Sequence, residues 1–119
     1  ISLVNTFTAM VIDIETRKAV LANSTGGLSG PAIKPIAVYL VNKVYREVTR
    51  DRGIPIMGLG GIRNASDAIE FIIAGAATVA AGTASFIEPS AAVKIADGIR
   101  QYCDKHGIGD IKQLTGSLS

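Results

Sequence analysis

The sequence predicts an α/β fold built from successive strand–helix units, and three observations lead to this prediction. Short apolar runs alternate along the chain with longer segments in which apolar residues recur every three or four positions. The short runs are apolar at nearly every position, which is typical of strands in a parallel sheet that helices cover. Glycine-rich stretches follow two of these runs, as in the loops that connect a strand to the next helix.

The first strand is expected at residues 1–6, ISLVNT. A β-hairpin is expected next, in the segment MVIDIETRKAVLA at residues 10–22, because two apolar runs flank the polar stretch from Glu15 to Lys18. This hairpin would interrupt the strand–helix alternation before the first helix.

A glycine-rich loop, STGGLSGPAIKP, spans residues 24–35 and leads into the first helix. That helix is predicted from Pro31 to about Arg50, because prolines are tolerated in a first turn, where both Pro31 and Pro35 fall. Its apolar positions would form one face: Ile33, Ala37, Leu40, Val41, Val44 and Val48.

Two further strand–helix units complete the chain. GIPIMGL (residues 53–59) and ATVAAG (77–82) are predicted as fully buried strands. NASDAIEFIIAG (64–75) is predicted as a helix, with Asn64 or Ser66 as its N-cap and Gly75 as its stop. Pro89 would open the last helix and Gly107 would end it, with one face made of Val93, Ala96, Ile99 and Cys103.

Three strand–helix units leave both edges of a parallel sheet unpaired. A doubly wound sheet and a (β/α)8 barrel with most of its strands missing both explain this pattern. The chain opens directly on an apolar strand without an initiator methionine, so we expect a fragment of a longer domain.

Composition excludes several classes of partner. The chain is 48% hydrophobic, and its 12 basic and 10 acidic residues nearly cancel, so no charge excess points to nucleic acid or a membrane surface. The long uncharged run at residues 71–87 contains two glycines and is better explained by a helix end, a strand and a loop than by a membrane span. The single cysteine, Cys103, excludes an internal disulfide, so we expect a reducing, cytoplasmic location.

The ends of the second and third strands predict a phosphate site. Gly60 and Gly61 follow one strand, and Gly82 and Thr83 follow the next, so both loops would leave the sheet on the same side. Glycines let backbone N–H groups approach an anion closely, and Thr83 would add a hydroxyl donor. The alternative is that these glycines only make tight turns.

The other reactive side chains favour structural roles. Cys103 would lie in the core, His106 at a helix end, and Lys34 in a structural or surface position. Asn5 alone could simply cap a turn. No metal-binding spacing, paired carboxylates or Ser-His-Asp set is present.

Three segments carry a resemblance to a known family: NTFTAMVIDIETRKAVLANSTGGLSGPAIKPIAV, IPIMGLGGI and AAGTASF. They resemble the C-terminal part of the class 1 dihydroorotate dehydrogenases, over about residues 1–107, and GGLSGPAIKP resembles the NAD-linked class 1B form. The resemblance implies that residues 1–119 are the C-terminal fragment of a single FMN-binding (β/α)8 TIM barrel. They would hold about strands six to eight with their helices, and the N-terminal strands would be absent.

The resemblance also implies roles for individual residues. Asn5 and Thr6 would hydrogen-bond orotate, Val4 would contact FMN, and Gly30 would pack on the flavin. The FMN phosphate would be held by Gly60, Gly61, Gly82 and Thr83. No catalytic residue and no metal ligand is expected here, because the family's base and a flavin-contacting lysine lie on earlier parts of the barrel.

In the intact enzyme, the resemblance implies that FMN takes a hydride from C6 of dihydroorotate while the base removes a C5 proton, in pyrimidine biosynthesis. Electrons would pass to NAD through a partner subunit that carries FAD and an iron–sulfur cluster, and the catalytic subunits would form a homodimer. The segment 46–56, REVTRDRGIPI, is longer than the family pattern, so we expect an insertion in a surface loop.

Two alternatives remain open at this point. One is the related flavin domain of a dihydropyrimidine dehydrogenase. The other is a non-catalytic module that binds a phosphate-bearing ligand.

Overall fold

A parallel three-stranded sheet lies at the centre of the protein, whose residues 1–119 are all described by a computed structural model. Strands β1 (Ser2–Leu3), β6 (Met57–Leu59) and β7 (Thr78–Ala80) pair in the order β1-β6-β7. Both pairings are parallel, with Leu3 opposite Gly58 and Gly58 opposite Val79. The predicted α/β class is confirmed, although each strand is shorter than its apolar run.

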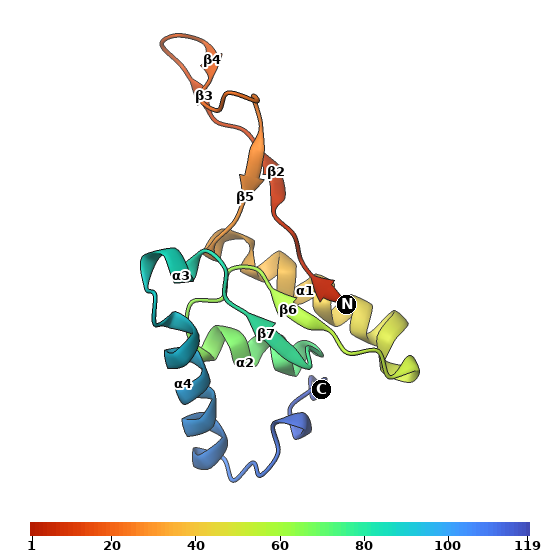
Figure 1. The fold of residues 1–119 in the computed structure, drawn as a ribbon. Coiled ribbons are helices and arrows are strands. Elements are labelled where there is room, and N and C mark those ends of the chain that lie inside the picture. The colour runs from red at the N-terminus through yellow and green to blue at the C-terminus, as the bar shows by residue number, and fades with distance from the viewer.

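Helical segments follow β5 (Gly26–Leu28), β6 and β7, as Figure 1 shows. The principal helices are α1 (Lys34–Val44), α2 (Ala65–Ala74) and α4 (Ala91–Lys105). Shorter pieces are the 3₁₀ turns Pro31–Ile33, Arg50–Arg52 and Ile111–Gln113, the π-helical turn Tyr45–Thr49, and α3 (Ala84–Ile87), which was not predicted. None of these helices has the length and apolarity required to cross a membrane.

The expectation that the extra length within residues 46–56 forms a loop is wrong, because residues 46–52 are helical. The chain continues from α1 through the π-helical turn and a 3₁₀ turn until Gly53, which adopts a left-handed φ of 63°. No proline or glycine occurs between Ile36 and Arg52 to break the helix. The inward-facing Thr49 is buried within this continuation.

The signals that start and stop α2 are confirmed. The Asn64 side chain accepts a hydrogen bond from the Asp67 N–H, 2.9 Å away, which is the geometry of an N-cap. Gly75 ends the helix with a φ of 126°, and the Tyr45 ring occupies the space that a side chain at this position would need.

The predicted face of α4 is wrong in part. Ala91 and Ile95 are buried, whereas Val93 is 64% exposed. The helix is turned so that Gly98 lies directly against Ala65 of α2, where an added Cβ would be only 2.5 Å from the Ala65 Cβ. That close approach fixes which side of α4 faces the core.

The core lies on one face of the sheet only. Residues of α1, α2 and α4 meet there, and Phe71 is completely buried beneath Gly58. Along β6 the side chains alternate between faces, so Gly58 is buried whereas its neighbour Met57 is 43% exposed. The prediction of fully buried strands is therefore wrong for this chain, because none of its elements covers the second face.

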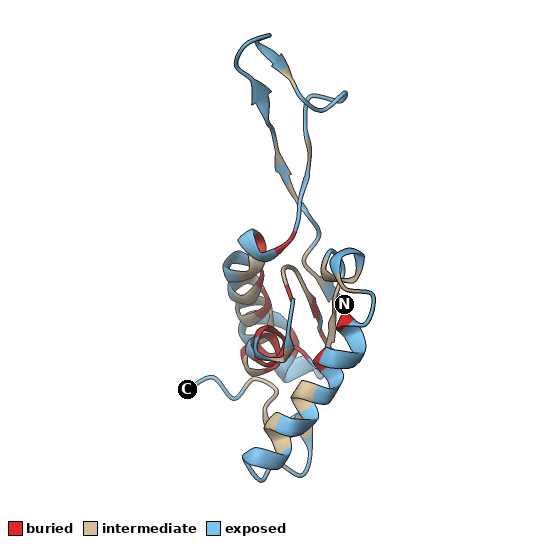
Figure 2. Ribbon diagram, turned by 90° about the vertical axis from the view of Figure 1, so that its left-hand side faces the viewer, coloured by how far each residue is buried: buried red, intermediate tan, exposed pale blue.

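An antiparallel extension projects from the sheet after β1 (Figures 1 and 2). Strand β2 (Phe7–Ala9) pairs with β5 (Gly26–Leu28), and β3 (Ile12–Asp13) pairs with β4 (Lys18–Ala19) farther out. The hairpin predicted at residues 10–22 is confirmed, but residues 26–28 form a strand where a loop was expected. No residue between 7 and 29 is buried.

Candidate functional site

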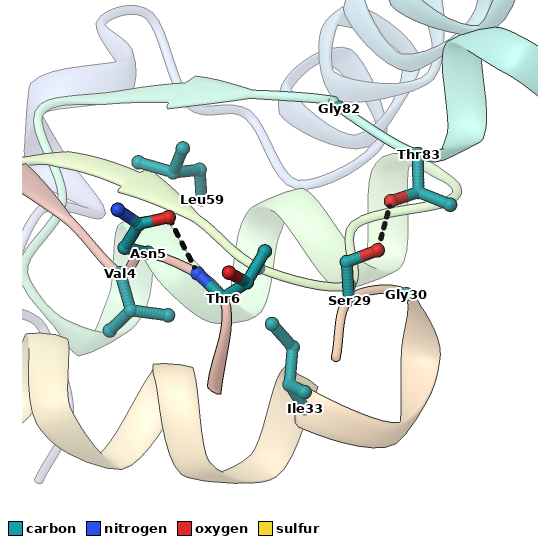
Figure 3. A pocket seen from close by; sticks show the side chains of 11 residues that line it. Val4, Asn5, Thr6, Ser29, Gly30, Ile33, Leu59, Gly82 and Thr83 are labelled. Atoms are coloured by element: carbon teal, nitrogen blue, oxygen red, sulfur yellow. Dashed lines mark hydrogen bonds between the residues drawn. The ribbon is translucent and has the colours of Figure 1, made fainter. Parts of the chain in front are cut away.

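A cleft of about 150 Å³ lies at the carboxyl ends of the three parallel strands. Asn5 follows β1, Gly60 follows β6 and Gly82 follows β7, so the parallel topology brings these loops to one edge of the sheet. Figure 3 shows the cleft between these strand ends and the start of α1. All eight residues singled out from the sequence line it: Val4, Asn5, Thr6, Gly30, Gly60, Gly61, Gly82 and Thr83.

The glycine loops present backbone donors that the chain itself does not use. The N–H groups of Gly61, Gly82 and Thr83 donate to no other group of the protein. A Cβ built on Gly82 would meet no atom within 4 Å, so open space lies beside this donor. Unpaired N–H groups around open space are the arrangement that binds a phosphate oxygen.

Gly60 and Gly61 are also required by packing. Gly60 has a φ of 132°, and an added Cβ would be 2.8 Å from the Cβ of Ala37. Gly61 has a φ of 82°, and its Cβ would be 2.7 Å from the Gly30 carbonyl oxygen and 2.9 Å from the Lys34 Cβ. The tight-turn explanation therefore accounts for the missing side chains, while the unpaired Gly61 N–H remains available to an anion.

Ser29 links the loop before α1 to the loop after β7 and was not predicted. The Thr83 hydroxyl donates to the Ser29 Oγ at 2.8 Å, across 54 positions of sequence (Figure 3). The Thr83 side chain is thus engaged with the protein, and its backbone N–H is the free donor. No local pattern pointed to Ser29, because the contact depends on how the two loops converge.

Asn5 and Thr6 occupy the opposite side of the cleft from Thr83 (Figure 3). The Asn5 Oδ1 accepts a hydrogen bond from the Thr6 N–H at 2.8 Å, which is the turn-like role considered from the sequence. The Asn5 Nδ2 makes no contact of this kind and can donate to a ligand. The Thr6 hydroxyl lies over Gly27 of β5, so only glycine fits there.

The remaining wall is apolar and carries no acidic residue. Ile33 and Leu59, neither of which was predicted, line the cleft with Val4. Gly30 is buried, and its φ of 88° turns the backbone so that an added Cβ would point into open space. Such a surface suits the face of a planar ligand.

A buried carboxylate lies beside the loop that follows β6, at residues 60–63. Asp67 is 3% exposed; its Oδ1 accepts from the Lys34 Nζ at 2.7 Å and its Oδ2 from the Arg63 N–H at 3.0 Å. Burial acts to raise the pKa of Asp67, but the hydrogen bonds from Lys34 and Arg63 outweigh it and lower that pKa below its ordinary value. The Asp67 and Glu70 carboxylates raise the pKa of Lys34. Of the structural and surface roles expected for Lys34, these two ion pairs favour the structural one.

The other residues considered from the sequence lie away from the cleft. His106 caps the end of α4, where its Nδ1 is 2.8 Å from the Tyr102 carbonyl oxygen, and Cys103 is half-buried on the same helix. The structure brings together no group of three or more histidine, cysteine, aspartate or glutamate side chains that could hold a metal ion.

Comparisons with known proteins agree on one family. A family model described as dihydroorotate dehydrogenase matches residues 1–103. The chain is 52% identical over 118 residues to the dihydroorotate dehydrogenase B (NAD(+)) catalytic subunit of Pelobacter propionicus, covering 99% of this chain and 38% of that protein. The catalytic subunit of the same name from Trichlorobacter lovleyi is 53% identical, with the same coverage of both chains.

A solved structure leads to the same family. The crystal structure of DHODH from Eimeria tenella in complex with ferulenol matches with a TM-score of 0.76 and 26% sequence identity. The match covers 98% of this chain and 30% of that one. The chain thus spans well under half the length of the relatives that it matches.

Proposed function

Because the chain belongs to the dihydroorotate dehydrogenase family, we propose that the full-length protein is an FMN-dependent oxidoreductase that converts dihydroorotate to orotate. The NAD(+) in the name of its relatives supports the B-type form, in which electrons pass to NAD through a separate subunit carrying FAD and an iron–sulfur cluster. The catalytic subunit would form a homodimer in the cytoplasm.

Within that protein, residues 1–119 would form the C-terminal part of a single (β/α)8 barrel. Strands β1, β6 and β7 would be the barrel's sixth, seventh and eighth strands. Two features support this placement: the sheet is parallel, and helices cover one face only, as on a barrel wall. The exposed face with Met57 would then face the barrel interior.

The cleft would hold the phosphate end of FMN and one side of the substrate. The free N–H groups of Gly61, Gly82 and Thr83 would bind the phosphate oxygens, as loops after the last two strands do in many barrels. Gly30 and Val4 would lie against the flavin, and Asn5 and Thr6 would hydrogen-bond the orotate ring. FMN, when bound, accepts the hydride; the residues of this chain fix the relative positions of cofactor and substrate.

The main support for this proposal is that the loops after three parallel strands meet at one cleft that no acidic side chain lines. To test it, the full-length protein is purified with its flavin and mixed anaerobically with dihydroorotate. Bleaching of the flavin absorbance by dihydroorotate, with little change by dihydrouracil, is the expected result. Bleaching by dihydrouracil alone would favour a dihydropyrimidine dehydrogenase, and a protein that holds no flavin would contradict the proposal.

A further inference from the structure

The ion pair between Lys34 and Asp67 has no role in the proposed function. Asp67 is the only carboxylate among the buried residues, and it lies in the first turn of α2. That turn already has an N-cap in Asn64, so helix formation alone does not require a buried charge. Burying a carboxylate is unfavourable unless partners compensate it, so its partners indicate what it does.

One partner, Arg63, belongs to the loop at residues 60–63 that follows β6, and the other, Lys34, belongs to the first turn of α1. One Asp67 oxygen holds the Arg63 N–H, at the end of the loop that begins at Gly60. The other oxygen holds the Lys34 ammonium, at the start of α1. The carboxylate therefore ties the end of the loop to the first turn of the helix behind it.

The middle of the loop is held against the same turn. An added Cβ on Gly61 would lie 2.9 Å from the Lys34 Cβ and 3.1 Å from its backbone nitrogen. The Gly61 N–H, a free donor of the cleft, is therefore fixed by contact with Lys34 on one side and by the anchoring of Arg63 two residues later. Loss of the Asp67 carboxylate would release the Arg63 N–H directly and would remove the ion pair that holds the Lys34 side chain beside Gly61.

We infer that Asp67, acting through Lys34 and Arg63, is a positioning residue for the phosphate-binding loop, an inference that rests on the proposed function. The pair holds the loop at residues 60–63, and with it the Gly61 N–H, in the position from which it would donate to a phosphate oxygen. Fixed donors bind an anion more tightly than mobile ones, because less conformational entropy is lost on binding. Loss of the pair should therefore weaken recognition of the phosphate group specifically.

The ratio of two affinities measures this effect. FMN and riboflavin share the isoalloxazine ring and the ribityl chain but only FMN carries the phosphate. The full-length protein is freed of flavin and titrated with each compound, and flavin fluorescence gives both dissociation constants. A variant that merely lowers the folded fraction changes both apparent affinities equally and leaves the ratio unchanged.

Asp67→Asn is expected to reduce the preference for FMN over riboflavin roughly tenfold, the size of one weakened charge-assisted contact. Lys34→Met, which removes the other partner, should do the same and serves if Asp67→Asn does not fold. The control is Glu70→Gln: Glu70 is the second, more exposed partner of Lys34, with its Oε1 at 2.7 Å, and does not contact the loop. The preference of Glu70→Gln for FMN over riboflavin should stay within about twofold of the wild-type preference.

Two results would overturn parts of the argument separately. If the wild-type protein prefers FMN and the variants at Asp67 and Lys34 keep that preference, the positioning role is wrong and the pair only joins two helices. If the wild-type protein binds riboflavin as tightly as FMN, the phosphate site itself is wrong, and the proposed function loses its cofactor geometry.

Discussion

Gly82 offers the cleanest substitution at the proposed phosphate site. Its Cβ position is open, and its φ is not in the left-handed region, so Gly82→Val adds a branched side chain beside the free N–H groups without straining the fold. We expect loss of bound flavin with the melting temperature of the apoprotein unchanged. Gly109→Val is the matched control, because its Cβ position is also open and lies outside the cleft. A Gly82→Val protein that stays fully yellow would contradict the assignment.

Gly61 would be a poor choice for the same experiment. A side chain there would collide with the Gly30 carbonyl oxygen and Lys34, so flavin loss would follow from misfolding as readily as from a blocked site.

Asn5 tests the substrate side of the cleft. In Asn5→Ala the free Nδ2 donor is lost, and the orotate group it would serve is left without a partner. Such a loss typically costs about 1–3 kcal/mol, which is roughly ten- to a hundredfold in affinity. Titration of the flavin spectrum with orotate should show this increase in dissociation constant at unchanged flavin content. An unchanged constant would limit Asn5 to its hydrogen bond with the Thr6 N–H.

The gathering of these residues around one cleft could be predicted from the sequence, but the contacts inside the cleft could not. Gly60 and Gly82 end successive parallel strands, so topology alone places them together. The Ser29–Thr83 hydrogen bond joins residues 54 positions apart and depends on the height at which each loop leaves the sheet. No local pattern encodes that height. The pairing of Asp67 with Lys34 was missed because it depends on how α1 and α2 pack together, which no local pattern shows.

At the contact between α2 and α4, the effect of a substitution on packing can be compared with its effect on helix propensity. Replacing glycine by alanine inside a helix usually stabilises it by about 1 kcal/mol. In Gly98→Ala the new methyl would lie 2.5 Å from the Ala65 Cβ, and overpacking of this kind costs about 1–3 kcal/mol. We therefore expect a lower urea midpoint for the full-length protein.

A compensating change isolates that contact. Ala65 is the first residue of α2, where glycine has little effect on the helix, so Ala65→Gly with Gly98→Ala moves the methyl across the interface. The double variant should regain most of the lost stability. A single variant as stable as the wild type would mean that the helices separate without cost.

The helices were predicted more accurately than the strands. Asn64 and Gly75 are local signals, and they fixed both ends of α2. The glycines of β5 favour loops, and the strand forms only because Phe7–Ala9 lies opposite to pair with it. Val93 was placed on the wrong side of α4 because helical spacing does not reveal where Gly98 permits the closest approach.

As a whole, residues 1–119 are open and incompletely buried. Their radius of gyration is 16.6 Å, against about 13.5 Å for a compact domain of this length, and 18 of 119 residues are buried. Strands β1 and β7 each leave an edge unpaired, and Met57 lies exposed on the uncovered face. Unpaired edges and exposed apolar surface both favour association.

Residues 1–119 expressed alone should therefore aggregate or assemble, bind FMN weakly or not at all, and oxidise no dihydroorotate. Size-exclusion chromatography with a flavin titration measures both properties. A monodisperse monomer that binds FMN with micromolar affinity would show that the cleft and core are sufficient by themselves.

The antiparallel extension has a consequence for motion as well as shape. Its two short ladders carry no buried residue, so its backbone amides can exchange their hydrogens with solvent by local opening, without unfolding of the core beneath Phe71. Thr6 and Ser29, which connect the extension to the rest of the protein, line the cleft. A molecule seated between these two residues would hold them together and slow exchange in β2 and β5. Hydrogen exchange in the extension would then report whether the cleft at its base is occupied.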